Sequence, residues 1–156
     1  MFEATITGTK FVTCDAMNQC LIWNTEEWEI EESFLASTKN HCLSSVVWSP
    51  CENFLAFGGM QNITIWHVDI PKNPKKLYVF NEAHHSNITN LLYTNDGKYL
   101  VSASGSSSDN IIKFWGLADR NLELEITITH KWFGINRKEY NEAIELLRMD
   151  PKDKYL

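Results

Sequence analysis

The chain has 156 residues, of which 44% are hydrophobic and 22% charged, a composition typical of an ordinary globular domain. Its formal net charge of -6 argues against a nucleic-acid backbone as the main partner, because phosphate binding depends on clustered Lys and Arg. Residues 1–10 do not have the pattern of a signal peptide, and no segment has the roughly 20 apolar residues that a membrane helix needs. We therefore expect neither a membrane partner nor a directly bound nucleic acid.

The four cysteines show neither a Cys-x-x-Cys pair nor a histidine at zinc-finger spacing, so neither a redox motif nor a metal site is indicated. Disulfide frameworks belong mainly to shorter, secreted chains. We therefore expect reduced thiols in an intracellular protein, cytoplasmic or nuclear, with a disulfide framework as the alternative. The cysteines are Cys14, Cys20, Cys42 and Cys51.

A turn followed by the start of a strand recurs along the chain. A degenerate first copy lies at residues 7–12, and further copies lie at 49–55, 94–100 and 150–156. In each copy, turn residues such as Pro, Gly, Asn, Asp, Ser or Thr precede apolar residues. This pattern is typical of the connection between two antiparallel strands. Six Trp, eight Phe and five Tyr also favour strands, because aromatic residues fit half-buried pleated surfaces.

A second block, which ends in tryptophan, follows each of the first three turns. When the apolar residues Val12, Leu55 and Leu100 are aligned, the first two tryptophans lie 11 positions further on and the third lies 15 positions further on. The four extra positions of the third unit coincide with the Gly-Ser-Ser-Ser tract at 105–108, which we interpret as a longer loop. The three tryptophans are Trp23, Trp66 and Trp115.

Two units also have a histidine, His41 or His84, before their first strand. A Gly-His-like dipeptide, a Ser-Pro-Asp-Gly-like turn and a Trp-Asp-like strand end, repeated roughly every 40 to 50 residues, resemble the WD-repeat family. The resemblance covers nearly the whole chain. Some positions depart from the family pattern: Asn40 and Ala83 replace the Gly, and Asn24, His67 and Gly116 replace the Asp. The match therefore depends on the regular spacing of the three copies and not on any single residue.

The resemblance implies an all-β fold, a partial β-propeller of about three WD-type blades that are antiparallel four-stranded sheets. An unrelated β-sandwich is the alternative for short strands with regular turns. Closed propellers typically have four to eight blades, so we expect that this chain alone does not close the ring. It is then a fragment of a longer polypeptide, or a second copy or a partner completes the ring. The expected blades are a partial blade 1 at about 1–35, blade 2 at 40–80, blade 3 at 84–128 and a partial blade 4 at 129–156.

Residues 131–142 interrupt the last unit with a polar segment that contains aromatic residues. Asn136 followed by Glu139 is a pattern that caps a helix. The alternative is a first blade strand at 144–149, in register with the strand before the third turn. We expect the strand from about Ala143, with a short helix before it.

In a complete blade, the resemblance implies a buried structural cluster of a His, a Ser or Thr, an Asp and the strand-end Trp. A buried imidazole and a buried indole need hydrogen-bond partners, and an Asp can fix the tautomer of the His. A hydrolase triad is the alternative interpretation of the same residue types. The first two units have Met17 and Met60 where the Asp would be, so we expect their clusters to be incomplete. In the third unit the candidates are His84, Ser102, Asp109 and Trp115.

The sequence has no Gly-rich phosphate loop, no zinc-protease His pair and no nucleophile-elbow motif. We expect no catalytic residue, cofactor, metal or small-molecule partner. The resemblance implies a non-enzymatic scaffold or adaptor that binds other proteins or the missing blades of a larger propeller. The alternatives are an actin-binding WD protein, from a loose similarity over residues 57–84, and a scaffold subunit of a ribonucleoprotein assembly. Candidate partner contacts are the acidic run at 26–32 and Lys72, Lys75, Lys76, Trp132 and Phe133.

Overall fold

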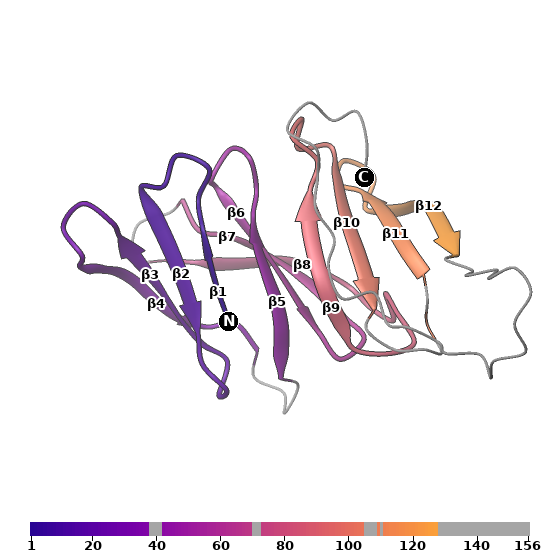
Figure 1. Cartoon of the computed structure of the whole chain (residues 1–156), viewed down its shortest axis with the longest axis horizontal. Coiled ribbons are helices and arrows are strands. Elements are labelled where there is room, and N and C mark those ends of the chain that lie inside the picture. The colour runs from indigo at the N-terminus through magenta and orange to yellow at the C-terminus, as the bar shows by residue number, and fades with distance from the viewer. Residues whose placement is uncertain (38–41, 70–72, 105–108, 110, 128–156) are drawn as a thin grey trace, which may run out of the picture.

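A computed structural model describes residues 1–37, 42–69, 73–104, 109 and 111–127. Within these residues, twelve β-strands form three antiparallel sheets of four strands each, arranged side by side in an unclosed row (Figure 1). The all-β fold class predicted from the sequence is confirmed. The described part of the chain contains no helix that is long and apolar enough to span a membrane. The expected fourth blade, with its inserted segment 131–142, lies outside the described residues.

The first sheet has its strands in chain order, and it contains four strands although we expected only a partial blade. The reason is a short first strand, Phe2–Ala4, which pairs with residues 11–13. The strands are β1 (Phe2–Ala4), β2 (Lys10–Cys14), β3 (Gln19–Asn24) and β4 (Ile30–Leu35).

The second and third sheets repeat this order, each strand pairing with the next along the chain. The second consists of β5 (Leu43–Trp48), β6 (Phe54–Gly59), β7 (Ile63–His67) and β8 (Lys75–Phe80). The third consists of β9 (Ile88–Tyr93), β10 (Tyr99–Ser104), β11 (Ile111–Gly116) and β12 (Asn121–Thr127). The first strands of successive sheets lie beside each other, because β5 contacts both β1 and β9.

The turn between the first and second strand of each sheet has the same hydrogen bonds. In the third sheet the backbone N–H of Gly97 donates to the carbonyl of Thr94 (2.8 Å), and the Thr94 hydroxyl accepts from the N–H of Tyr99 (3.1 Å). Gly97 has a φ of 69°, a left-handed conformation that favours glycine. The first two sheets repeat these bonds with Thr5, Gly8 and Lys10 and with Ser49, Glu52 and Phe54.

This turn geometry corrects the alignment of the first unit by one residue. The structure pairs Trp23 with Phe11, whereas Trp66 pairs with Leu55 and Trp115 with Leu100. Phe11, and not Val12, is therefore the equivalent of the two leucines. Since successive residues of a strand point to opposite faces, the shift places Val12 on the face toward the second sheet.

The core lies between the sheets, which pack against each other through apolar faces. Val12 and Ile22 of the first sheet belong to one cluster with Leu55 and Phe57 of the second, and all four are at most 2% exposed. Burying each such side chain contributes about 1.5–3 kcal/mol. Between the second and third sheets the packing is close at Gly58, where a Cβ would lie 2.8 Å from the Ile88 side chain. The second cluster contains Ala56, Ile63, Ile65, Phe80, Ile88, Leu91, Tyr93, Leu100 and Trp115, among others.

Cys14 and Cys20 form a disulfide, so the expectation of reduced thiols is wrong at these two positions. They are direct partners on the neighbouring strands β2 and β3, and their Cα atoms are 4.2 Å apart. In an antiparallel pair of this kind both side chains project from the same face. Cys42 and Cys51 are free and exposed.

We expect thiol titration of the denatured chain to find two reactive thiols before reduction and four after it. In a Cys14→Ser variant, Cys20 loses its partner, so three thiols should react without reduction. Four reactive thiols in the unreduced wild-type protein, purified without oxygen, would restore the expectation from the sequence.

Candidate functional site

The third sheet contains a buried polar cluster made by the four residues that the sequence singles out. Ser102 Oγ lies 2.8 Å from both Trp115 Nε1 and His84 Nε2, and His84 Nδ1 lies 3.3 Å from Asp109 Oδ1. His84, Ser102 and Asp109 are at most 1% exposed, and Trp115 is 7% exposed. We call these four residues the His84 cluster. It joins the segment before β9 to β10, β11 and the loop between them.

The donors and acceptors of the His84 cluster fit one arrangement of protons. The indole N–H of Trp115 can only donate, so Ser102 Oγ accepts from it. The Ser102 hydroxyl then donates to His84 Nε2, and the proton on Nδ1 points at Asp109. The other oxygen of Asp109 accepts from the backbone N–H groups of His85 (2.7 Å) and Ser86 (3.2 Å).

Burial and hydrogen bonding set the charges in the His84 cluster. Burial lowers the pKa of His84 below its ordinary value of 6.5, and the hydrogen bond and charge of Asp109 oppose this effect only in part. Burial raises the pKa of Asp109, but the hydrogen bonds from His84, His85 and Ser86 outweigh it and leave that pKa below 3.8. A neutral imidazole therefore lies beside an ionised carboxylate. The Ser102 hydroxyl is fully buried and already bonded on both sides, so this arrangement supports a structural role and not that of a nucleophile.

The two other blade tryptophans have different environments. Trp23 Nε1 donates to Thr13 Oγ1 at 3.0 Å, and Thr13 holds the register position that Ser102 holds in the third sheet. Trp66 Nε1 is buried without a partner, because the side chain at that register position is Phe57. The two methionines in the place of the Asp are exposed, Met17 by 80% and Met60 by 51%.

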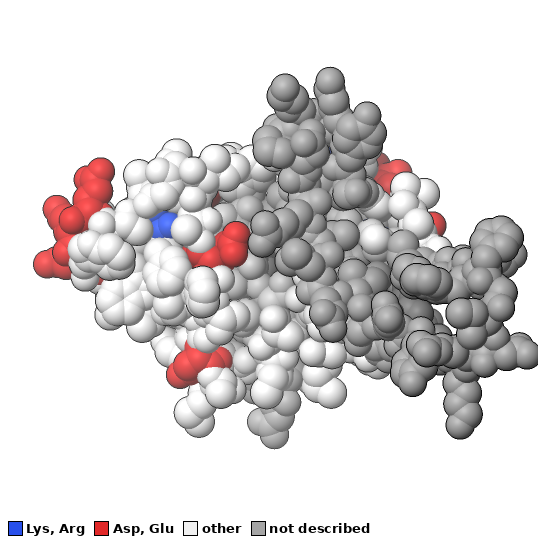
Figure 2. Space-filling model, viewed as in Figure 1, with Lys and Arg blue, Asp and Glu red and all other residues white. Residues whose placement is uncertain are grey.

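Two of the candidate lysine contacts and the acidic run lie in the described residues. Lys75 and Lys76 are exposed at the start of β8, whereas Lys72, Trp132 and Phe133 lie outside the described residues. Exposed Glu26, Glu27 and Glu29 belong to the connection between β3 and β4, and acidic side chains gather at that end of the molecule (Figure 2).

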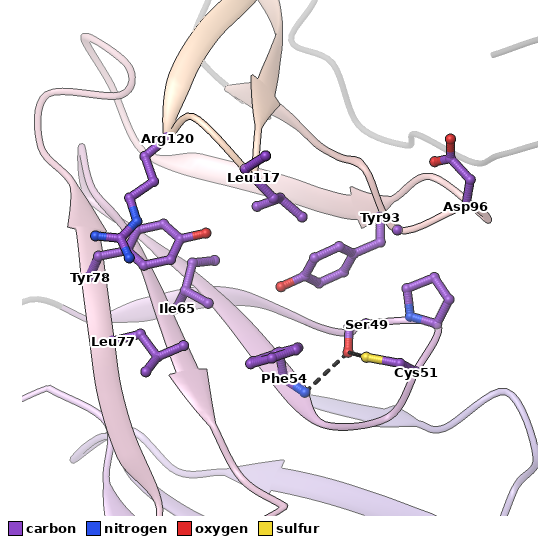
Figure 3. Close-up of a pocket in the computed structure, with 13 residues that line it drawn as sticks. Ser49, Cys51, Phe54, Ile65, Leu77, Tyr78, Tyr93, Asp96, Leu117 and Arg120 are labelled. Carbon is purple, nitrogen blue, oxygen red and sulfur yellow. Dashed lines mark hydrogen bonds between the residues drawn. The ribbon is translucent and has the colours of Figure 1, made fainter.

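A cleft of about 640 Å³ opens between the second and third sheets, and no pattern in the sequence indicated it. Its apolar walls come from strands and turns of both sheets, and Arg120 and Asp96 lie at its edges (Figure 3). These segments are scattered over some 70 positions of the chain, so no spacing reveals them. The lining residues are Ser49, Pro50, Cys51, Phe54, Ile65, Leu77, Tyr78, Tyr93, Asp96, Gly97, Leu117, Ala118 and Arg120.

The face of the first sheet that points away from the second sheet is apolar and open. Phe2 is 71% exposed, Ile30 50% and Leu35 43%, and half-buried Phe11 and Trp23 belong to the same face by register. The rings of Phe2 and Phe11 are 5.8 Å apart, so they form a contiguous surface. We call it the outer face of the first sheet.

Comparison with known families identifies the family of this chain. The sequence model of the family described as eukaryotic translation initiation factor eIF2A matches residues 7–125, which covers all three sheets except β1 and the last residues of β12. The chain belongs to the eIF2A family. The predicted WD-repeat nature is confirmed as well, by the relative and the solved structure described next.

One relative of this eIF2A-family chain is an uncharacterized WD repeat-containing protein, L84, of Acanthamoeba polyphaga mimivirus, 35% identical over 80 residues. The alignment covers 51% of the chain and 58% of that protein. The crystal structure of the RRP9 WD40 repeats has the same fold, with a TM-score of 0.69 at 17% identity, over 81% of the chain and 37% of the RRP9 chain. The eIF2A-family chain thus spans less than two thirds of either protein.

We expect Ser102→Ala to lower the free energy of unfolding by about 2–4 kcal/mol, because two buried groups, Trp115 Nε1 and His84 Nε2, lose their partner. The matched control is Thr13→Val, which leaves only the half-buried Trp23 N–H unpaired and should cost about 1 kcal/mol. Urea denaturation followed by tryptophan fluorescence measures both. An equal loss in the two variants would contradict the special role of the His84 cluster.

The stability of the chain should depend on pH through His84. Because its pKa is lower in the folded chain than its ordinary value of 6.5, the unfolded chain takes up the proton first as the pH falls. The contribution of neutral His84 is therefore complete above about pH 6.5 and is lost as the pH drops below that value. We expect the free energy of unfolding to decrease between about pH 7.5 and 5.5 in wild type and in His85→Gln, the exposed neighbour, and to decrease less in His84→Gln. An unchanged pH dependence in His84→Gln would refute this assignment.

Proposed function

We propose that this chain is a non-enzymatic protein-interaction scaffold and that it forms part of a larger WD-repeat propeller. WD-repeat architecture, three phased sheets and membership of the eIF2A family support the proposal. The one Ser-His-Asp constellation in the described residues uses its polar groups internally, in the His84 cluster. An intracellular location and contacts through Lys72, Lys75 and Lys76 are part of the same proposal.

The observation that carries the proposal is the outer face of the first sheet. In a propeller each sheet is covered on both faces by its neighbours. The second sheet is covered in this way, since separate apolar clusters join it to the first and to the third. The first sheet leaves Phe2, Ile30 and Leu35 in solvent, and large exposed apolar patches usually mark protein contacts. A further blade, or a partner of similar shape, is the natural cover for this face.

A scaffold role in a ribonucleoprotein assembly is a second candidate. The description of the matched family as a translation initiation factor favours it, because translation starts on a ribonucleoprotein particle. The net charge of -6 indicates that the chain would contact the proteins of such an assembly and not its RNA. Actin binding, the other alternative, has no specific observation in its favour.

We expect the purified chain to self-associate at micromolar concentrations through the outer face of the first sheet, in sedimentation-velocity experiments. The double variant Phe2→Ser/Ile30→Ser should shift the chain toward monomer with little change in melting temperature, because both side chains are already half or more exposed. The matched control Ile6→Ser/Met17→Ser changes turn residues that are exposed by 72% and 80%. It should leave the association unchanged.

A monodisperse wild-type chain over the same concentration range would contradict the proposal that the outer face of the first sheet needs a cover. Association that survives Phe2→Ser/Ile30→Ser and is lost in the control would place the contact elsewhere.

A further inference from the structure

The cleft between the second and third sheets has the size and lining of a recognition site. Its volume of about 640 Å³ lies within the range of roughly 300–1,000 Å³ typical of small-ligand pockets. Phe54, Ile65 and Leu77 line one side from the second sheet, and Tyr93 and Leu117 line the other from the third (Figure 3). Such a cavity is large enough for one big apolar side chain and the peptide backbone beside it.

Tyr93 places a polar group in the cleft. Its side chain is 7% exposed and reaches into the cavity from the end of β9 (Figure 3). Within the described part of the chain, its hydroxyl has no hydrogen-bond partner. Burial raises its pKa, so the hydroxyl stays protonated and is able to donate. A donor that faces an apolar cleft and has no partner in the described residues can bond to an acceptor that a ligand brings.

Arg120 places a positive charge at the edge of the same cleft. Its guanidinium carbon lies 4.7 Å from the centre of the Tyr78 ring, which holds the planar group over an aromatic face and leaves its N–H edge available. The acidic residue that lines the cleft, Asp96, is paired with Lys98 at 3.1 Å. Arg120 forms no ion pair with any carboxylate in the described residues.

We infer that this cleft binds an extended peptide of a partner protein, with a large apolar residue followed by an acidic one. The apolar side chain packs between Leu77 and Leu117, a peptide carbonyl accepts from the Tyr93 hydroxyl, and the carboxylate pairs with Arg120. Among the described residues, Arg120 is the one cationic residue that lines the cleft, so it is what selects an acidic residue at that position. The inference rests on the proposed role as a protein-interaction scaffold and names the chemistry of one ligand.

The probes are capped pentapeptides with the central sequence Phe-Glu between glycines, and the same peptide with Ala-Glu, Phe-Gln or Phe-Lys. Binding to the whole chain is measured by NMR, from the shifts of the Ile65, Leu77 and Leu117 methyl groups. We expect the Phe-Glu peptide to bind and the Ala-Glu peptide to cause no shifts. The Phe-Gln peptide should bind about 5-fold more weakly, the usual upper effect of an exposed ion pair, and Phe-Lys more weakly still.

Variants separate the three contacts. Arg120→Gln should remove the preference for Glu over Gln, whereas the control Lys75→Gln, an exposed base of β8 outside the lining, should keep it. Tyr93→Phe should weaken binding about 5-fold and leave that preference unchanged. Leu77→Asp should abolish binding, whereas Leu122→Asp, a similarly exposed leucine outside the cleft, should not.

Three results would overturn the inference. The first is the absence of methyl shifts with the folded chain at millimolar Phe-Glu peptide. The second is equal affinity for the Glu, Gln and Lys peptides, and the third is a preference for Glu that survives Arg120→Gln. None of these results concerns the self-association through the outer face of the first sheet, so failure of the cleft and failure of the proposed function remain distinguishable.

Discussion

Face-to-face packing of thin apolar sheets is the interaction on which this structure depends. A four-stranded sheet has two faces and no interior, so it becomes stable only when neighbouring sheets cover it. Val12 and Ile22 meet Leu55 and Phe57 across one such interface, and Ile63 and Ile65 meet Ile88 and Leu100 across the next. In the described residues, the second sheet is the only one with a neighbouring sheet on both faces, and the first sheet leaves one face open.

The three sheets differ in how they accommodate the indole N–H of the strand-end tryptophan. A strand-end tryptophan brings an indole N–H into a crowded environment, and Ser102 or Thr13 accepts from it in the third and first sheets. In the second sheet Phe57 replaces the hydroxyl, and the aromatic rings compensate: Phe34 lies 6.1 Å from Phe57 and 4.9 Å from Trp66. Apolar contact thus substitutes for a hydrogen bond, at the cost of an unpaired N–H on Trp66.

The polar groups of the molecule divide into two classes by their partners. Those of the His84 cluster are bonded to each other and hold the segment before β9 to β10, β11 and the loop between them, so they are not available to a ligand. Tyr93 and Arg120 lie near apolar walls and have no such partners in the described residues. This contrast explains why a Ser-His-Asp pattern contributes to rigidity here, while a tyrosine and an arginine with no motif around them mark the recognition site.

The sequence by itself determined the fold class and the repeat, because turn residues and strand-end tryptophans recur at regular spacings along the chain. The residues of the His84 cluster were indicated by the resemblance to WD repeats that these spacings carry. The sequence did not determine register: one residue separates Val12 from Phe11, and only the hydrogen bonds of the turns show which of them faces the second sheet. Nor did it show that Cys14 and Cys20 are cross-strand partners, or that Tyr93 and Arg120 border one cleft. Those features depend on which strands pair and how two sheets approach, and long-range packing sets both.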